Sequence, residues 1–358
     1  MQQVEYEMRS ERVTQKCSDV VKRLVALMLL GAALACNTTD SDDDGLLGPE
    51  FQAGALPFNT LSQCVPVNLA DNALKPYVGN IWRPETATDE GFTDRWNQLT
   101  PEYAGKWANI EPVRGTQIWE SLDAGYDYSR VNSIPWKYHT LVWGSSIPAW
   151  VKELDEEQQR IAVSLWFSAV GTRYSEIGQI DVVNEPLHSP PRFSGVFGGA
   201  GETGWDWVIS LYELARVHFP NSELLLNDFN ILAFDEATGD YLEIIDLLIQ
   251  RDLIDGIGVQ GHFLQGKDLR VIKANLDRLA NTGLPVYVSE LDVSMQDDLA
   301  QAAVYRDVFP LLYEHPAVAG ITFWGWREGQ HWQRYAHLMR EDGSSRPSLD
   351  WLDCYLGR

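Results

Sequence analysis

Two glutamates carry the clearest chemical signal in this chain. Glu185 stands in the segment Val-Val-Asn-Glu-Pro and Glu290 in the segment Ser-Glu-Leu-Asp, and each follows a short apolar run. A carboxyl pair that faces a sugar ring from two sides can hydrolyse an acetal, because one group protonates the leaving oxygen while the other attacks or activates water. A single glutamate at such a place is as readily a structural salt-bridge partner, but two of them in this context favour catalysis.

The stretches around these glutamates alternate between short apolar runs and amphipathic segments. Eight runs rich in β-branched and aromatic residues are typical of buried parallel strands, and they cover residues 77–82, 98–103, 138–143, 180–186, 223–229, 256–263, 286–293 and 320–326. Apolar residues at helical spacing predict helices within 155–176, 204–218, 241–251, 268–281 and 299–314. Residues 113–135 are expected to be mostly irregular, with only a weak helical signal.

Eight strands with interleaved helices predict an α/β protein, a (β/α)8 or TIM barrel, that forms a single catalytic domain over residues 56–358. An open doubly wound sheet would need a glycine-rich phosphate turn after its first strand, and the sequence has none there. In a barrel the carboxyl ends of the strands line the active site. Predicted strands four and seven lie nearly opposite each other across the barrel mouth, so Glu185 and Glu290 are expected to face one another.

Polar and aromatic side chains gather at the carboxyl ends of most predicted strands. Beyond the two glutamates they are Glu102, His139, Trp143, Asn184, Asn227, Asp228, Gln260, His262, Asp292, Trp324 and Trp326. A purely structural barrel would have only a few stray polar residues at these places. The pattern therefore predicts one site built from six or seven strands.

At these residues the sequence resembles glycoside hydrolase family 10, the endo-β-1,4-xylanases, from about residue 77 to residue 355. The motifs that carry the resemblance are Lys106-Trp107 with Ile110-Glu111-Pro112, HTLVW at 139–143, Val182-Val183-Asn184-Glu185-Pro186, Asn227-Asp228-Phe229-Asn230, GVQGH at 258–262 and Ser289-Glu290-Leu291-Asp292. Asn-Glu-Pro alone is typical of a wider clan of barrel glycosidases, whereas the ordered set is specific to this family.

The resemblance implies a retaining, endo-acting hydrolase of β-1,4-xylosidic bonds that works by double displacement. It implies that Glu185 is the acid and then the base, and that Glu290 is the nucleophile. It implies supporting roles for Asn184 on the sugar 2-hydroxyl, for Gln260 in positioning the nucleophile, and for His262, between Glu290 and Asp292, in keeping Glu290 ionised. The residues expected to bind substrate are Glu102, Lys106, His139, Trp143, Trp324 and Trp332.

Three positions depart from the family pattern on the side of the glycone, the part of the substrate that becomes bonded to the enzyme. Tyr103, Gly144 and Ser146 stand where the family usually has Asn, His and Gln. We expect the chemistry to survive and the sugar preference or affinity to change, unless neighbouring loops compensate; one or two lost sugar hydrogen bonds cost about 1–3 kcal/mol. Two alternatives stay open: the same chemistry on another β-glycan or β-glycoside, and a surface glycan-binding protein with degenerate catalysis.

No cofactor and no metal are expected, because the histidines show no metal-ligand spacing, and His188 is expected in a surface loop. The formal net charge of −23 argues against nucleic acid as a partner, since the surface repels phosphate backbones. A neutral polysaccharide, xylan or a related β-glycan, fits this charge better, although the charge can equally serve solubility alone. We expect a monomer.

The N-terminal region predicts export. Residues 1–36 resemble a bacterial lipoprotein signal: two basic residues precede the apolar stretch 24–35, which is too short to span a bilayer, and Ala-Leu-Ala-Cys ends at Cys36. Cys36 is then the expected lipidated residue, and residues 37–55 an acidic, flexible tether. The expected location is a bacterial membrane or cell surface, with contact to the membrane only through the lipid. An ordinary cleaved signal, which would make the protein secreted, and a plain hydrophobic anchor are the alternatives.

Two cysteines fall near the ends of the predicted domain, Cys64 and Cys354. The first and last elements of a closed barrel are neighbours, so these cysteines are expected to form a disulfide in an oxidising compartment. Two buried free thiols are the alternative.

Overall fold

The structure is a computed structural model that describes residues 64–69, 76–84 and 91–358. All of these belong to one compact unit, residues 57–358. The predicted signal, the predicted tether and Cys36 lie outside the described residues. Among the helices that are described, none is long and apolar enough to cross a membrane.

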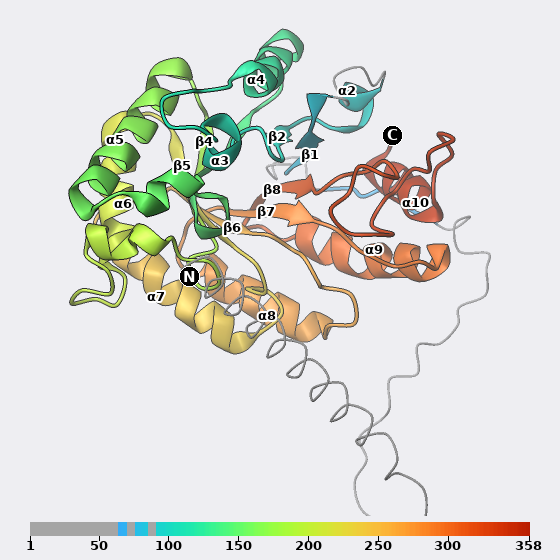
Figure 1. The fold of residues 1–358 in the computed structure, drawn as a ribbon. Helices are drawn as coiled ribbons and strands as arrows, with labels where there is room; N and C mark the ends of the chain where they lie inside the picture. The colour runs from blue at the N-terminus through green and yellow to red at the C-terminus, as the bar shows by residue number, and fades with distance from the viewer. Residues whose placement is uncertain (1–63, 70–75, 85–90) are drawn as a thin grey trace, which may run out of the picture. The chain divides into compact units, whose positions relative to one another are not determined.

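Eight parallel strands form the centre of this unit, and the helices lie outside them (Figure 1). The strands are β1 (Tyr77–Trp82), β2 (Leu99–Pro101), β3 (Lys137–Trp143), β4 (Gln179–Asn184), β5 (Glu223–Asp228), β6 (Gly256–Val259), β7 (Val286–Leu291) and β8 (Val318–Phe323). Their order in the sheet is β2-β1-β8-β7-β6-β5-β4-β3. A parallel bridge between Leu99 and Trp136 joins β2 to the start of β3 and brings the two sheet edges together. The prediction of a (β/α)8 barrel is therefore confirmed.

The five predicted helices are present as α5 (Glu156–Arg173), α6 (Asp206–His218), α7 (Asp235–Ile249), α8 (Leu269–Ala280) and α9 (Asp298–Tyr313). Short helices α2 (Phe92–Arg95) and α3 (Trp107–Ile110) flank β2, and α10 (Pro347–Leu356) follows β8. Three 3-10 turns, η3 (Gly144–Ser146), η4 (Ala149–Glu153) and η5 (Arg192–Phe197), lie in the loops after β3 and β4.

The expectation of a mostly irregular stretch at 113–135 is wrong, because α4 (Glu120–Asn132) is a regular helix of 13 residues. Its buried face consists of Leu122, Gly125 and Ser129, of which only the leucine is strongly apolar. Gly125 lets the helix approach Trp82 of β1, since a Cβ there would lie 2.9 Å from the indole. Because two of these three buried residues are small, few large apolar residues mark this helix in the sequence.

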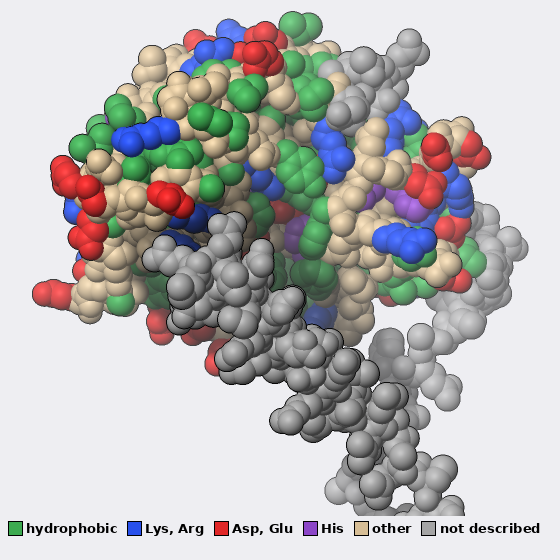
Figure 2. Space-filling view, in the orientation of Figure 1, with side chains coloured by type: hydrophobic (Ala, Val, Ile, Leu, Met, Phe, Trp, Pro, Cys, Tyr) green, Lys and Arg blue, Asp and Glu red, His purple; other side chains and the backbone are tan. Residues whose placement is uncertain are grey.

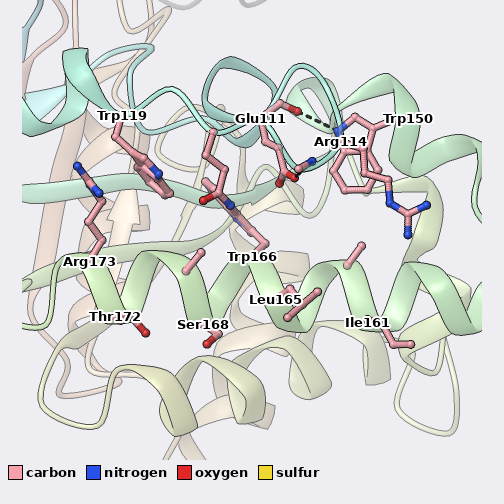
Figure 3. Close-up of a pocket in the computed structure, with 14 residues that line it drawn as sticks. Glu111, Arg114, Trp119, Trp150, Ile161, Leu165, Trp166, Ser168, Thr172 and Arg173 are labelled. Atoms are coloured by element: carbon pink, nitrogen blue, oxygen red, sulfur yellow. Dashed lines mark hydrogen bonds between the residues drawn. The ribbon is translucent and has the colours of Figure 1, made fainter.

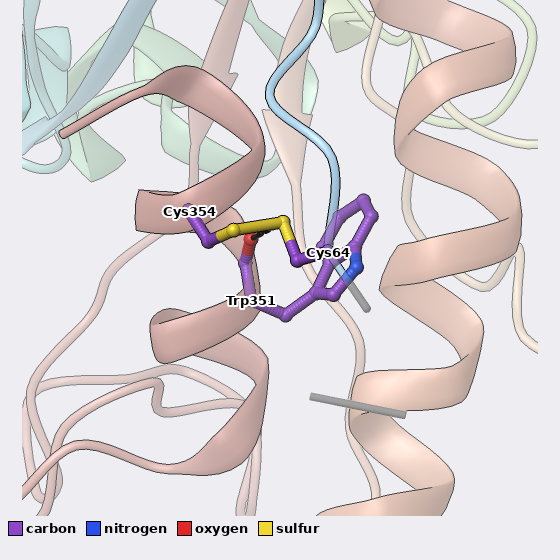
Figure 4. The surroundings of a disulfide bond; sticks show 3 residues. All are labelled: Cys64, Trp351 and Cys354. Atoms are coloured by element: carbon purple, nitrogen blue, oxygen red, sulfur yellow. Dashed lines mark hydrogen bonds between the residues drawn. A yellow bond between two sulfur atoms is a disulfide. The ribbon is translucent and has the colours of Figure 1, made fainter. Parts of the chain in front are cut away.

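A disulfide joins the two ends of the described unit: Cys64 bonds to Cys354 of α10, with Cα atoms 6.3 Å apart (Figure 4). The backbone N–H of Val67 also donates to Tyr355 O at 2.8 Å. The indole of Trp351, one turn before Cys354, lies beside the bridge (Figure 4). These contacts hold the entering segment against the last helix.

Replacing Cys354 with serine should lower the stability of the protein. The two cysteines are 290 residues apart, and a bridge over a long loop restricts the unfolded chain, so its loss typically costs about 2–5 kcal/mol. Thermal unfolding should therefore begin several degrees lower for Cys354→Ser, and Cys64→Ser should behave the same way. A reductant should shift the wild type and leave both variants unchanged. An unfolding curve of the wild type that ignores reductant would contradict this bridge.

Candidate active site

A cavity of about 360 Å³ opens where the strands end. Its lining includes both glutamates and nearly all the predicted supporting and substrate-binding residues: Glu102, Tyr103, Lys106, His139, Trp143, Asn184, Glu185, Phe229, Gln260, His262, Phe263, Glu290, Trp324 and Trp332. In the space-filling view this face is hollowed, and acidic, basic and histidine side chains lie within the recess (Figure 2). Parallel strands explain the gathering, because all their carboxyl ends meet at one rim.

Glu290, on β7, is buried and firmly held. Its Oε1 accepts a hydrogen bond from Asn227 Nδ2 at 2.7 Å, and His262 Nε2 lies 3.3 Å from its Oε2. Burial by itself would raise the pKa of this carboxyl, but the hydrogen bond from His262 and the charges of His139, His262 and Lys137 outweigh it and lower the pKa to about 2. Glu290 is therefore ionised across the physiological pH range.

His262 follows β6 and is held between two carboxylates. Its Nδ1 lies 2.9 Å from Asp292 Oδ1, on the side opposite Glu290. Burial opposes its protonated form, but the charges of Asp292 and Glu290 and their hydrogen bonds prevail and raise the pKa of His262 to about 10. Asp292 does not line the cavity; its Oδ2 accepts a hydrogen bond from Trp332 Nε1 at 2.8 Å and so also fixes that indole.

A second cluster of ionisable side chains lies on β3 and β4 and reaches the cavity through His139. Lys137 Nζ and His139 Nδ1 each lie 2.9 Å from Asp181 Oδ2, and all three residues are buried. The β3–β4 pairing sets His139 opposite Asp181, so strand register alone brings them together. The sequence patterns did not identify Lys137 or Asp181 as site residues, although a charge within an apolar strand was the available signal.

Glu185, directly after β4, has different surroundings. Trp143 Nε1 donates to its Oε2 at 2.8 Å and Gln260 Nε2 donates to its Oε1 at 3.1 Å. Burial raises the pKa of Glu185; these two hydrogen bonds oppose the rise, while the negative charges of Glu290 and Asp228 add to it. Its pKa is thus shifted in the direction opposite to that of Glu290.

Gln260 has a different partner from the one the resemblance implied. Its side chain donates to Glu185, whereas the amide that donates to Glu290 belongs to Asn227. Asn227 Nδ2 is also 2.8 Å from Asn184 Oδ1, so it links Asn184 to Glu290. The backbone of Gln260 does bond to Glu290, since the Glu290 N–H donates to Gln260 O at 2.8 Å.

The end of the cavity expected to bind the glycone combines a cation with aromatic rings. Lys106 Nζ lies 4.6 Å from the ring centre of Trp143 and 4.9 Å from that of Tyr103. Burial lowers the pKa of Lys106, against the raising effect of Glu290 and the other nearby glutamates. Glu102 pairs with Arg83. Tyr103 keeps 45% of its surface exposed at this end, so it is available to contact a sugar.

The other two departures from the family pattern are not among the described residues that line the cavity. The presence of glycine at position 144 has a steric explanation: a Cβ there would lie 2.3 Å from Ser189 O and 2.5 Å from Pro190 O. The loop after β4 therefore occupies the space where another residue would need a side chain. Ser146 lies at the end of η3, and nothing in the structure explains its replacement of the usual glutamine.

An aromatic wall that the sequence patterns did not assign forms part of the cavity. Phe229 and Phe263 line it, and each directly follows a polar residue at a strand end. Phe263 lies 6.4 Å from Phe229 and 6.0 Å from Trp332 between ring centres. Trp324 lines the cavity as predicted, whereas Trp326, also expected at the site, is buried in the core against Trp96.

A larger cavity, of about 700 Å³, lies between α5 and residues 111–119 (Figure 3). Trp119 stacks on Trp166 at 6.0 Å, and Arg173 lies 5.2 Å from the centre of Trp119. Arg114 covers the third indole, Trp150, at 5.7 Å. The rings are thus covered by one another or by guanidinium groups, and neither predicted catalytic glutamate lines this cavity. The candidate site is the smaller one.

A (β/α)8 barrel with one glutamate after β4 and another on β7, both in one cleft, has the layout of the barrel glycoside hydrolases. The comparison with protein families narrows this class. The model described as glycosyl hydrolase family 10 matches residues 71–352, and the chain belongs to that family.

Relatives and solved structures agree with this membership. The chain is 36% identical over 283 residues to endo-1,4-beta-xylanase B of Cellvibrio japonicus, covering 78% of this chain and 45% of that protein. It is 30% identical to an endo-1,4-beta-xylanase of Agaricus bisporus, covering 75% of this chain and 85% of that one. The chain thus spans under half of the Cellvibrio protein. Native xylanase 10B from Thermotoga maritima shares the fold, with a TM-score of 0.70 and 22% identity over 79% of this chain and 95% of that chain.

The charge on His262 should make stability depend on pH. The pKa of His262 in the folded protein, about 10, exceeds its usual 6.5, so its stabilising effect is complete below pH 6.5 and is lost as pH rises through about 10. The wild type should therefore lose stability relative to His262→Gln as pH rises from 6.5 to about 10. The difference between their free energies of unfolding should fall by up to about 1.4 kcal/mol per pH unit. Urea unfolding at a series of pH values measures it.

His218→Gln is the matched control, because burial lowers rather than raises the pKa of His218. Its difference from the wild type should show no such decline above pH 6.5. A His262→Gln difference that stays constant from pH 6.5 to 10 would contradict the charge assignment.

Proposed function

We propose that the protein is a retaining endo-1,4-β-xylanase. The observation that carries this is the pair Glu185 and Glu290 in one cleft, with pKa values shifted in opposite directions. A retaining glycosidase needs one carboxyl that holds a proton and one that has lost it. Membership of family 10, together with relatives named endo-1,4-beta-xylanase, supports xylan as the substrate class.

In the proposed first step Glu185 donates its proton to the oxygen of the glycosidic bond while Glu290 attacks the anomeric carbon. The bond to the leaving sugar breaks, and a covalent glycosyl-enzyme forms on Glu290. In the second step Glu185, now ionised, takes a proton from water, and the resulting hydroxyl replaces Glu290 at the anomeric carbon. Two inversions give net retention.

The surrounding residues are proposed to orient the sugar. Asn184, which shares the amide of Asn227 with Glu290, is suited to bind the 2-hydroxyl beside the reacting carbon. Further contacts come from a group of polar and indole side chains at the cavity wall, Glu102, Lys106, His139, Trp143, Trp324 and Trp332. Indole faces offer sugars apolar contact, and the charged groups offer hydrogen bonds.

The exposed ring of Tyr103 favours a second candidate, the same chemistry on a different β-glycan or β-glycoside. A phenol ring replaces the amide that the family usually has there, so a sugar loses one hydrogen-bonding pair and gains a stacking surface. Digesting xylans and β-glucans in parallel and sizing the products separates the two candidates. Cleavage of a glucan but of no xylan would favour this second candidate.

Wild-type protein should release reducing ends from xylan, and Glu290→Ala should abolish the release because no covalent intermediate can form. Glu185→Ala should slow xylan hydrolysis about 10²–10⁴-fold, the usual contribution of general acid catalysis. Glu213→Ala, at an exposed position on α6, is the control and should match the wild type. Turnover retained by Glu290→Ala would contradict the assigned roles, and glycan binding without any product would indicate a degenerate binding protein.

We further propose that the protein is exported and anchored through a lipid on Cys36. The proposal is supported by the order of basic residues, the apolar stretch 24–35 and a cysteine. In a bacterial host, mass spectrometry should find a mature protein that begins with an acylated Cys36, and Cys36→Ser should move the protein from the membrane fraction to the soluble one. A mature N-terminus at another residue, without acylation, would contradict the anchor.

A further inference from the structure

The backbone of Glu185 depends on the turn that follows it. Its φ is +57°, in the left-handed region that a non-glycine residue seldom occupies without support from its surroundings. Its carbonyl oxygen accepts hydrogen bonds from Ser189 N at 2.7 Å and His188 N at 3.2 Å. The direction of the Glu185 side chain is therefore set by how residues 186–190 are held.

A buried carboxylate at the end of β5 holds this turn from one side. Asp228 Oδ2 accepts the backbone N–H of Leu187 at 3.0 Å, and Asp228 Oδ1 lies 2.7 Å from His188 Nδ1. The His188 ring also stacks on Phe229 with ring centres 3.8 Å apart. The Asp228 side chain is fully buried while that of His188 is 30% exposed, so a partly exposed imidazole pairs with a carboxylate that has no solvent contact of its own.

The end of β3 holds the turn from the other side. Gly144 N donates to Ser189 O at 3.0 Å, and the hydroxyls of Ser145 and Ser189 lie 2.7 Å apart. With no Cβ at residue 144, the turn can come this close. The turn after Glu185 is thus held between the end of β3 and the end of β5. Among the described residues, His188 is the histidine that pairs with Asp228.

The pKa shifts of His188 and Asp228 agree with a close pairing of the two side chains. The hydrogen bond with Asp228 raises the pKa of His188 against its partial burial. Burial raises the pKa of Asp228, and His188 opposes that rise. Without His188, the buried Asp228 carboxylate would lose this hydrogen-bond partner, which is costly unless the carboxylate takes up a proton or the loop moves. Either response changes the surroundings of Glu185.

We propose that His188, held by Asp228, is a positioning residue that aims the Glu185 carboxyl at the glycosidic oxygen. The inference rests on the proposed function, because it assigns a role within that reaction. His188 itself touches no reacting atom in this account. Its loss should impair the transfer of the proton and spare the attack by Glu290.

Two aryl xylobiosides that differ only in the leaving group test this role. Dinitrophenolate leaves without protonation, whereas phenolate needs a proton from Glu185, and kcat/KM reports the first step for both. For His188→Leu we expect kcat/KM on phenyl β-xylobioside to fall at least tenfold and on 2,4-dinitrophenyl β-xylobioside less than twofold. His188→Asn, which keeps an N–H near the place of Nδ1, should recover most of the loss.

His315→Leu is the matched control, since His315 Nε2 also pairs with an aspartate, Asp277, at 3.0 Å but lies between α9 and β8 and not in the turn after Glu185. It should leave both values of kcat/KM unchanged. Should His188→Leu fail to fold, Asp228→Asn applies the same comparison and should show the same selective loss.

Equal losses on both substrates, or no loss on either, would overturn the positioning role while leaving the proposed function intact. A wild type that cleaves neither aryl xylobioside nor xylan would overturn the proposed function and this inference with it. Selective loss on the phenyl substrate, recovered by His188→Asn, is the supporting result.

Discussion

Keeping a buried carboxylate ionised is the constraint on which the rest of this site depends. Glu290 is almost fully buried, and burial alone would raise its pKa and favour the protonated form, which cannot attack. The imidazole of His262, after β6, and the charges of His139 and Lys137 on β3 reverse that tendency, while an amide from β5 donates a hydrogen bond to the same carboxylate. No single segment supplies all of these groups. A closed parallel barrel does, because the ends of neighbouring strands meet around one point, and the fold thereby provides the charge balance that the nucleophile needs.

The surroundings of Glu185 differ from those of Glu290. The side chain of Glu185 accepts hydrogen bonds from an indole N–H and an amide, both neutral donors, and the negative charges of Glu290 and Asp228 lie nearby. Two carboxyls in one cavity thus have opposite preferences for a proton because their neighbours differ in charge. This asymmetry, rather than the presence of two glutamates, is what suits the cleft to retaining hydrolysis. Tyr103 changes the wall of the cavity relative to the usual family pattern. It does not change the groups that set the pKa values of the two glutamates.

Much of this was predictable from local patterns. Apolar runs identified all eight strands, and polar residues at their ends identified both glutamates. The missed features have physical causes. Helix α4 packs through Gly125 and Ser129, so few large apolar residues mark it in the sequence. Lys137 and Asp181 can be recognised as partners only when the pairing of β3 with β4 is known. The partner of Gln260 depends on which rotamer reaches which carboxylate. The contact between His188 and Asp228 joins the turn after β4 to the end of β5, and neither segment alone shows it in its sequence.

The central claim is that the pKa values of the two glutamates are shifted in opposite directions. Carbon-13 NMR titration of protein labelled at the glutamate carboxyl carbons tests it most directly, with Glu185→Gln and Glu290→Gln spectra assigning the two signals. The account predicts that Glu290 stays ionised far below the usual range and titrates at about pH 2, while Glu185 titrates above the ordinary glutamate value. Two signals that titrate together near pH 4.5, or Glu185 losing its proton before Glu290, would contradict it.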